Sequence, residues 1–300
     1  MNTMATSSQK RGAGIRWVRI LPLLLALAVV AVVRCEPRWL QMWIAAGLIW
    51  LGCKWAMAEG DLALEQAPLV ARLLWWGWPG MDTKPFHGRV NASPVRWADI
   101  AQGLAWMSVG GLLFLEAAPR LAADHGLAAG WIAWGAIILT LHFGLFHIMA
   151  ALLRQTGIAV EPIMRNPFAA ETLAGFWGRR WNLAFQQVAH RFLFRPFAGL
   201  IGGHGAILLV FVVSGLVHEL VITIPAGGGY GLPTLYFLIQ GLALILEKTP
   251  LARAAGLGSG WKGRAFTLVA VLAPVPALFP PQFFRTVVVP FVASVSSLLS

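Results

Sequence analysis

One histidine, His218, lies in the string Val213–Leu220, inside an apolar stretch that we expect to cross a membrane. It comes thirteen residues after Gly205, so at about 1.5 Å of rise per residue it lies roughly 20 Å along the predicted helix. An ionisable side chain at that depth is costly, so it should face the bundle interior or a water-filled cavity. A histidine, with an ordinary pKa of about 6.5, can accept a proton from a hydroxyl group. His218 is therefore a candidate general base; the alternative is a neutral histidine hydrogen-bonded to a neighbouring helix.

Other polar residues lie in the same or nearby apolar stretches. Ser214 comes four residues before His218 and shares its helical face, so it could hydrogen-bond the ring, whereas Glu219 points elsewhere. His142 and His147 are five residues apart on a predicted helix, so their rings diverge by about 140° and cannot bind one metal. One of them could line the same cavity as His218, although helix packing is the simpler interpretation.

The spacing of potential ligands argues against a metal centre. His218-Glu219 begins like the zinc-protease motif H-E-x-x-H, but Ile222 occupies the position of the second histidine. The seven histidines include no pair three or four residues apart, as a histidine-box di-iron enzyme would need. Only two cysteines occur, Cys35 and Cys53, so a disulfide framework is not expected. We predict that the protein holds no metal.

The most specific string in the chain is FWGRRWN, residues 176–182. Arg179 and Arg180 lie next to each other and are flanked by Trp177 and Trp181. Guanidinium groups bind phosphate well, and aromatic rings can pack against a pantetheine or acyl chain. The string therefore predicts a site for an amphipathic, phosphate-bearing substrate. The alternative is a cationic interfacial helix that holds lipid headgroups.

The composition places these residues in a membrane protein. Of 300 residues, 58% are hydrophobic and only 12% are charged, where soluble domains usually have about 25% charged residues. We predict an all-α, polytopic integral membrane protein of about eight transmembrane helices plus interfacial helices. The predicted spans, each near the length that crosses about 30 Å of hydrocarbon, cover residues 17–33, 39–58, 97–118, 127–152, 205–224, 232–247, 265–279 and 286–299.

Basic residues predict the orientation of these spans. Eighteen of the 23 Lys and Arg residues fall on the side that carries the N-terminus, and four fall on the opposite side. Because cytoplasmic loops carry the excess of basic residues, both termini should be cytoplasmic. The net charge of +11 does not indicate nucleic-acid binding, since no long polar segment could carry a basic face.

The chain contains no internal repeat, so we expect a single membrane domain over residues 1–300. It would begin with a cytoplasmic tail, residues 1–16. A cytoplasmic or interfacial segment, residues 154–204, would carry FWGRRWN, and its many aromatic residues suit a position on the membrane. A second apolar segment, residues 68–86, suits an interfacial helix followed by a turn.

FWGRRWN, followed 36 residues later by the histidine of SGLVHEL, resembles the wax synthase branch of the membrane-bound O-acyltransferases. The strings EPIM at 161–164 and WPGMD at 78–82 are also similar to bacterial members. The resemblance covers residues 160–225 best and implies that His218 is catalytic and that Asn182 assists it. It implies a bacterial inner membrane protein that needs no cofactor.

The reaction implied by this resemblance moves a fatty acyl group from acyl-CoA, as co-substrate, to a long-chain alcohol or another lipid hydroxyl. Membrane lipids would surround the protein, and the sequence leaves the oligomeric state open. The second hypothesis is a lipid transporter or scramblase, in which intramembrane histidines and Lys54 would line the pathway. Polar residues concentrated near one histidine favour the enzyme.

Overall fold

The computed structural model describes residues 17–88 and 96–299. The predicted cytoplasmic tail, residues 1–16, lies outside the described residues. Every regular element in the described part is a helix, which confirms the all-α prediction. The helices are α1 (Trp17–Val32), α2 (Arg38–Ala58), α3 (Leu62–Glu65), α4 (Leu69–Gly77), η1 (Lys84–Phe86), α5 (Trp97–Leu112), η2 (Leu113–Ala117), α6 (Ala118–Ala122), α7 (Gly126–Ile138), η3 (Leu139–Leu145), α8 (Phe146–Gln155), η4 (Pro167–Ala169), α9 (Leu173–Arg179), α10 (Leu183–Ala189), η5 (His190–Phe194), α11 (Arg195–His218), η6 (Glu219–Thr223), α12 (Ile224–Ala226), α13 (Leu232–Glu247), α14 (Pro250–Ala254), α15 (Gly260–Leu272), α16 (Val275–Leu278), α17 (Pro281–Phe283), η7 (Phe284–Val288) and α18 (Val289–Leu299).

Each of the eight predicted spans coincides with helical structure, but the number of membrane crossings is not confirmed. Among the described residues, three continuous helices are long and apolar enough to cross a bilayer: Trp97–Ala122, Gly126–Gln155 and Leu183–Ala226. A fourth is possible if the bent pair Gly260–Leu278 and Pro281–Leu298, with 61° between its halves, forms one span. Ile20–Val32 and Leu232–Glu247 are apolar but shorter. The long apolar helices are those of a membrane protein, and the predicted count of eight crossings is not confirmed among the described residues.

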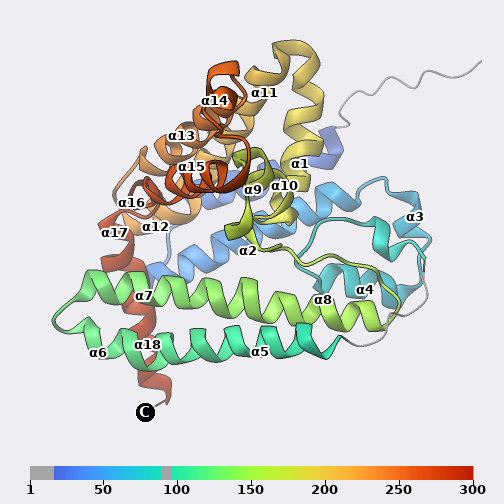
Figure 1. Ribbon diagram of the computed structural model, residues 1–300. Coiled ribbons are helices and arrows are strands. Elements are labelled where there is room, and N and C mark those ends of the chain that lie inside the picture. Colours follow the sequence, from blue (N-terminus) through green and yellow to red (C-terminus); the bar gives the residue numbers. More distant parts are fainter. Residues whose placement is uncertain (1–16, 89–95, 300) are drawn as a thin grey trace, which may run out of the picture.

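Two long helical rods form one side of the molecule (Figure 1). The first runs through α5, η2 and α6, and the second returns through α7, η3 and α8. They approach closely because glycines face the partner rod: a Cβ on Gly103 would lie 2.5 Å from Ile148, and one on Gly144 would lie 2.3 Å from Met107. Small residues of this kind let membrane helices pack with their backbones close together.

The helix that carries His218 bends at Gly202, whose φ of 74° and ψ of 165° are not helical. Glycine takes this conformation readily because it has no Cβ. The straight part of α11 therefore begins close to residue 205, where the sequence predicted a span to start. It packs along α13, and Gly215 permits the contact, since a Cβ there would lie 2.6 Å from the Cα of Thr234.

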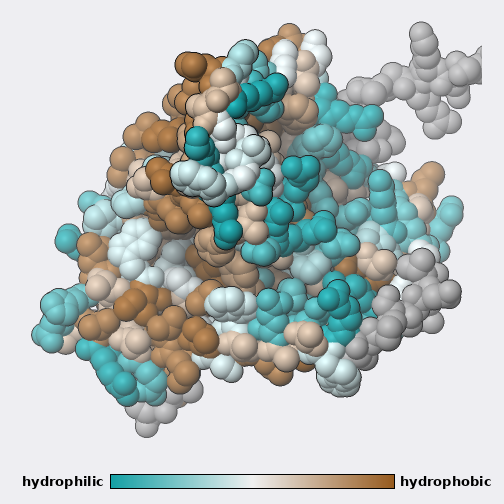
Figure 2. All heavy atoms as spheres, viewed as in Figure 1, coloured by the Kyte–Doolittle hydropathy of each residue, from teal (hydrophilic) through white to brown (hydrophobic). Residues whose placement is uncertain are grey.

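The surface separates apolar from polar regions (Figure 2). Hydrophobic residues gather over α13 and α16 at the upper left of the view, and hydrophilic residues occupy the centre and right, around α8, α9 and α10. The polar region is thus the one that contains FWGRRWN and the end of the second rod.

Candidate active site

The His218 ring lies at the C-terminal end of α11, where the π-helical turn η6 begins. Its Nδ1 lies 2.7 Å from the Ser214 carbonyl oxygen. A carbonyl oxygen can only accept, so Nδ1 carries the proton and Nε2 keeps its lone pair. The ring also packs against Phe237 of α13, with 4.4 Å between ring centroids. His218 is therefore held with a basic nitrogen that faces away from its own helix backbone.

Ser214 contributes to this arrangement through its backbone rather than its side chain. Its hydroxyl donates to the Val210 carbonyl, 2.8 Å away, one turn earlier. The expectation that the hydroxyl bonds the histidine ring is therefore corrected. Serine in an apolar helix commonly makes this bond because its own preceding turn offers the nearest acceptor.

Glu219 points to another neighbour, as the sequence predicted. Its carboxylate accepts hydrogen bonds from the Thr234 N–H (3.1 Å) and the Thr234 hydroxyl (2.9 Å), and also from the Thr223 hydroxyl. These bonds join the end of α11 to the start of α13. Glu219 thus positions α13, which supplies the aromatic wall beside His218.

FWGRRWN reaches the histidine through aromatic contacts. Trp177 lies 5.8 Å from Phe237, between ring centroids, and 5.8 Å from Phe211 of α11. Phe237 is the ring that packs on His218, so a single side chain joins the string to the histidine. The two features that carried the sequence argument are therefore next to each other in the fold.

Polar groups from α13 fix the helix that contains this string. The Trp177 Nε1–H donates to Gln240 Oε1 at 3.3 Å, and fully buried Gln240 donates in turn to the Ala270 carbonyl. At the start of α9, the Glu247 carboxylate accepts from the N–H groups of Leu173 and Ala174. A carboxylate at a helix N-terminus satisfies free N–H groups and complements the helix dipole.

The two arginines of the string have different environments. Arg180 donates to the carbonyl oxygens of Arg165 (3.2 Å) and Asn166 (3.1 Å), so it holds the segment that precedes α9. Arg179 is exposed, and the described part of the chain gives it no hydrogen bond or ion pair. The structure thus assigns Arg180 a structural contact and leaves the Arg179 guanidinium open to a ligand.

Asn182 lies between α9 and α10 in a left-handed conformation, with φ of 43° and ψ of 60°. Asparagine adopts this conformation more readily than most residues. Its N–H points to the Met164 sulfur at 3.2 Å, and the next N–H, of Leu183, donates to the Ile163 carbonyl. In the described structure its side chain makes no hydrogen bond to His218, so its assistance to catalysis stays a prediction.

The other two histidines lie in or beside the π-helical turn η3. His142 packs on Phe146 with 5.3 Å between ring centroids, and its buried Nδ1 has no hydrogen-bond partner among the described residues. His147 lines a cavity between α5 and α8 whose lining residues do not include His218. The structure therefore places His147 in a different cavity from the surroundings of His218.

Lys54 neither pairs with Glu59 nor reaches water. It is fully buried, and its Nζ donates to the carbonyl oxygens of Trp75 (2.6 Å) and Gly80 (2.7 Å). It also lies 3.9 Å from the centre of the Trp75 ring, a favourable cation–π arrangement. The lysine therefore holds the WPGMD string in place.

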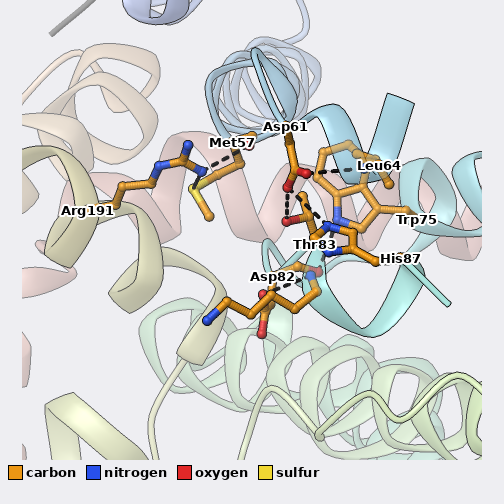
Figure 3. Close-up of polar contacts among 9 residues, drawn as sticks. Met57, Asp61, Leu64, Trp75, Asp82, Thr83, His87 and Arg191 are labelled. Atoms are coloured by element: carbon orange, nitrogen blue, oxygen red, sulfur yellow. Dashed lines mark hydrogen bonds and ion pairs between the residues drawn. The ribbon is translucent and has the colours of Figure 1, made fainter. Parts of the chain in front are cut away.

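A second polar cluster braces the same region (Figure 3). Asp61 Oδ2 accepts from the Thr83 hydroxyl at 2.5 Å and lies 3.1 Å from His87 Nε2, while Oδ1 accepts from the Leu64 N–H and caps α3. Partial burial alone would raise the pKa of the Asp61 carboxyl, but these hydrogen bonds and the nearby histidine outweigh it and lower the pKa. The cluster is thus a structural brace that requires an ionised carboxylate.

Several residues beside the site were not predicted from the sequence. Phe237 looks like any apolar residue of a span, so nothing in the sequence marks it as the partner of His218. Gln240 and Glu247 did carry a signal, because polar side chains within an apolar stretch are costly and usually have a specific partner.

Comparison with known proteins agrees with the family resemblance. Residues 160–239 match the family model described as "Membrane bound O-acyl transferase family". The chain is 30% identical over 164 residues to "Probable long-chain-alcohol O-fatty-acyltransferase 7" of Arabidopsis thaliana, covering 47% of each chain. It is 29% identical over 149 residues to "Acyl-CoA--sterol O-acyltransferase 1" of the same plant, covering 45% of this chain and 42% of the relative.

A shorter match links the chain to the "Long-chain-alcohol O-fatty-acyltransferase" of Simmondsia chinensis, 34% identical over 79 residues, or 23% of this chain and 22% of the relative. The matched regions thus span less than half the length of these curated relatives. The matched family region holds both FWGRRWN and His218. The resemblance to the membrane bound O-acyl transferase family is confirmed over residues 160–239.

Proposed function

We propose that this chain is a membrane-embedded O-acyltransferase that moves a fatty acyl group from acyl-CoA to the hydroxyl of a long-chain alcohol. The names of the similar proteins support the reaction, and one of them acts on a sterol. The observation that carries the proposal is the His218 ring, whose Nδ1 is committed to the Ser214 carbonyl and whose wall, Phe237, contacts Trp177 of FWGRRWN.

In the proposed reaction, His218 Nε2 takes the proton of the alcohol as the alcohol oxygen attacks the carbonyl carbon of the acyl thioester. A tetrahedral oxyanion forms, and Asn182 stabilises it or orients the alcohol. When the oxyanion collapses, the carbon–sulfur bond breaks and the thiolate takes the proton from Nε2. The products are an ester and a free thiol, and the histidine returns to its starting form. General base catalysis of this kind contributes about 10² to 10⁴ in rate.

The remaining substrate contacts belong to the same proposal. Trp177 and Trp181 would contact the donor, and exposed Arg179 would bind its phosphate groups. His142 and His147 are kept as substrate-contacting candidates. The orientation with both termini in the cytoplasm and the location in a bacterial inner membrane also stay predictions.

The test is to incubate the purified protein with labelled acyl-CoA and a panel of long-chain alcohols, sterols and diacylglycerol, and to analyse the lipid products. His218→Gln keeps a hydrogen-bonding side chain but loses the proton acceptor, so it should reduce ester formation by about 10²-fold or more. Asn182→Ala should leave measurable turnover, because the base remains. The matched control is His204→Gln, which changes an exposed histidine of the same helix and should leave activity unchanged.

Near-normal activity of a folded His218→Gln protein would refute this mechanism. If the wild-type protein forms no ester with any acceptor but moves fluorescent lipids between the leaflets of a vesicle, the transporter hypothesis replaces the enzyme.

A further inference from the structure

The loop that joins α13 to α15, residues 248–264, exposes both basic and apolar side chains. No residue in this range is acidic, and four are basic and exposed: Lys248, Arg253, Lys262 and Arg264. Two large apolar side chains of the same loop are also exposed, Leu251 by 80% and Trp261 by 76%. The loop therefore presents positive charge together with apolar side chains.

The chain folds back on itself within this loop, so the end of α14 lies against the start of α15. The Leu257 N–H donates to the Ala252 carbonyl at 3.0 Å, which turns the chain after α14. Gly256 allows the turn with a φ of 81°, and a Cβ there would lie 3.3 Å from the Lys262 side chain. In Figure 1, α14 lies at the upper edge of the molecule, next to α15. The exposed side chains thus come from one compact region.

This region lies where apolar helices end. The apolar helix Leu232–Glu247 stops directly before it, and the apolar helix pair that starts at Gly260 begins within it. Tryptophan is enriched at membrane–water interfaces, and lysine and arginine near the surface attract anionic headgroups. A loop that served only to orient the chain would need the basic residues but not exposed Leu251 and Trp261. The composition fits a surface that rests on a lipid layer with anionic headgroups.

The same loop is bonded to the segment that leads into FWGRRWN, residues 168–174. The Gly260 N–H donates to Glu171 Oε2 at 3.0 Å. The Arg264 Nε–H donates to the Phe168 carbonyl at 2.9 Å. Two hydrogen bonds therefore join the start of α15 to this segment.

Further contacts strengthen this connection. At the end of α13, the Glu247 carboxylate accepts from the first two N–H groups of α9. The backbones also approach closely, since a Cβ on Gly263 would lie 2.5 Å from the Glu171 carbonyl oxygen. We call these contacts, between residues 247–264 and residues 168–174, the clasp.

The clasp does not use most of the positive charge of the loop. Among the described residues, Lys248, Arg253 and Lys262 make no hydrogen bond or ion pair. The carboxylates of the clasp, Glu171 and Glu247, accept from backbone N–H groups instead. Three basic groups are thus available to an anionic partner.

We propose that residues 248–264 bind anionic phospholipid headgroups and that this binding stabilises the clasp. The charges draw the loop to the headgroups, and Leu251 and Trp261 enter the apolar layer beneath them. A loop fixed in this way holds residues 168–174 against it, because the clasp joins the two segments. The consequence for catalysis rests on the proposed function: FWGRRWN, which follows the clasped segment, is held in position best in a membrane that contains anionic lipid.

Nanodiscs of stated lipid composition test the binding. A fluorescent NBD group is attached to a cysteine at exposed Ser259, in protein whose Cys35 and Cys53 are replaced by Ser. Its emission should move to shorter wavelength as phosphatidylglycerol replaces phosphatidylcholine, and high salt should reverse the shift because salt screens exposed charges. A spectrum that ignores phosphatidylglycerol would overturn the proposal. An equal shift with inorganic phosphate in phosphatidylcholine nanodiscs would mean that the loop binds a soluble anion, and would overturn it as well.

Charge-matched variants separate this loop from the overall charge of the protein. The loop variant replaces three basic residues with Gln: Lys248, Arg253 and Lys262. It should lose the shift, because each basic residue near a membrane surface strengthens association about fivefold. The control variant replaces three exposed arginines outside the loop with Gln: Arg34, Arg120 and Arg285. It should respond as the wild type does, and equal responses of the two variants would contradict the assigned surface.

A buried cysteine measures the clasp itself. Ala170, 1% exposed, lies in the clasped segment, so a cysteine there reacts with a thiol reagent only when the segment opens. Phosphatidylglycerol should slow this reaction. Glu171→Ala removes the acceptor of the Gly260 N–H and should speed the reaction, whereas Glu65→Ala, at another exposed glutamate, should not. A reaction rate that is the same in both lipids would sink the link between lipid and clasp.

Ester formation separates this inference from the proposed function. Wild-type protein should form ester faster in phosphatidylglycerol nanodiscs, and the loop variant should lose this dependence. If both cysteine probes respond to lipid but no ester forms with any acceptor, the proposed function fails and the lipid surface stands. If ester forms equally fast in both lipids and neither probe responds, the proposed function stands and the lipid surface fails. Thermal unfolding of each variant, within a few degrees of wild type, confirms that the comparison is between folded proteins.

Discussion

At the scale of single residues, partly buried His218 and fully buried Lys54 have different roles. His218 keeps a free lone pair at Nε2, whereas both hydrogen bonds of the Lys54 ammonium go to backbone carbonyls. The nitrogen His218 Nε2 is therefore available to accept a proton, whereas the Lys54 Nζ is occupied by its hydrogen bonds. We therefore place chemistry at His218 and structure at Lys54.

Lys54→Met should destabilise the protein strongly. The change leaves the buried Gly80 carbonyl oxygen without a donor among the described residues, which costs about 1–3 kcal/mol, and it leaves the Trp75 carbonyl with only the Trp78 N–H. Thermal unfolding in detergent would measure the loss, and Lys84→Met, at an exposed lysine of the following turn, is the control. Equal stability of the two variants would contradict the assigned role.

Replacing Arg179 and Arg180 together with Gln should chiefly raise the donor KM, with a smaller effect on the acceptor. The two single variants should differ in thermal stability. Arg180→Gln loosens residues 165–166 and should lower thermal stability as well, while Arg179→Gln, at an exposed side chain, should leave stability unchanged. If the double variant keeps the wild-type donor KM, neither arginine binds the donor.

At the scale of elements, the contact of α11 with α13 sets the surroundings of His218. Gly215→Ala would place a Cβ 2.6 Å from the Thr234 Cα, so the helices must separate and carry Phe237 away from the histidine. We expect a stability loss of about 1–3 kcal/mol, as for other overpacked sites, and reduced ester formation. Gly199→Ala, on the same helix with open space around it, is the control and should be neutral or slightly stabilising.

The brace between α3 and the turn at residues 83–87 should make stability depend on pH. The pKa of Asp61 is lower in the folded protein than in the unfolded chain, so its contribution to stability is complete above the unfolded value of about 3.9 and is lost as pH falls through the folded pKa. Asp61→Asn should therefore cost about 1 kcal/mol near neutral pH and less in acid. Unfolding temperatures measured across pH test this, with exposed Asp124→Asn as the control. A constant difference at every pH would show that the carboxylate charge has no part in the brace.

At the scale of the whole molecule, the basic residues predict one orientation. In a protein whose Cys35 and Cys53 are replaced by Ser, single cysteines at Ser8, Thr156 or Ala255 should react only with reagents on the cytoplasmic side. A cysteine at Ala123, in the turn between α6 and α7, should react from the opposite side. Labelling of any of the first three from outside would overturn the topology.

The sequence by itself determined where helices form and which histidine to suspect, because hydropathy, spacing and the cost of a buried ionisable group are properties of a local stretch of chain. His218 and FWGRRWN could be singled out for this reason. The number of full-length spans was harder to predict, since hydropathy marks an apolar helix without fixing where it bends or ends, as at Gly202.

Only the tertiary structure decided which of these pieces meet. The aromatic link from Trp177 through Phe237 to His218 depends on how closely α11 and α13 approach, which Gly215 permits. The meeting of residues 78–82, 161–163 and 183 around one cavity depends on hydrogen bonds between segments far apart in the chain, such as those of Lys54 and of the Leu183 N–H. No periodicity or spacing encodes such a contact, because its free energy comes from packing that exists only when all the segments are in place.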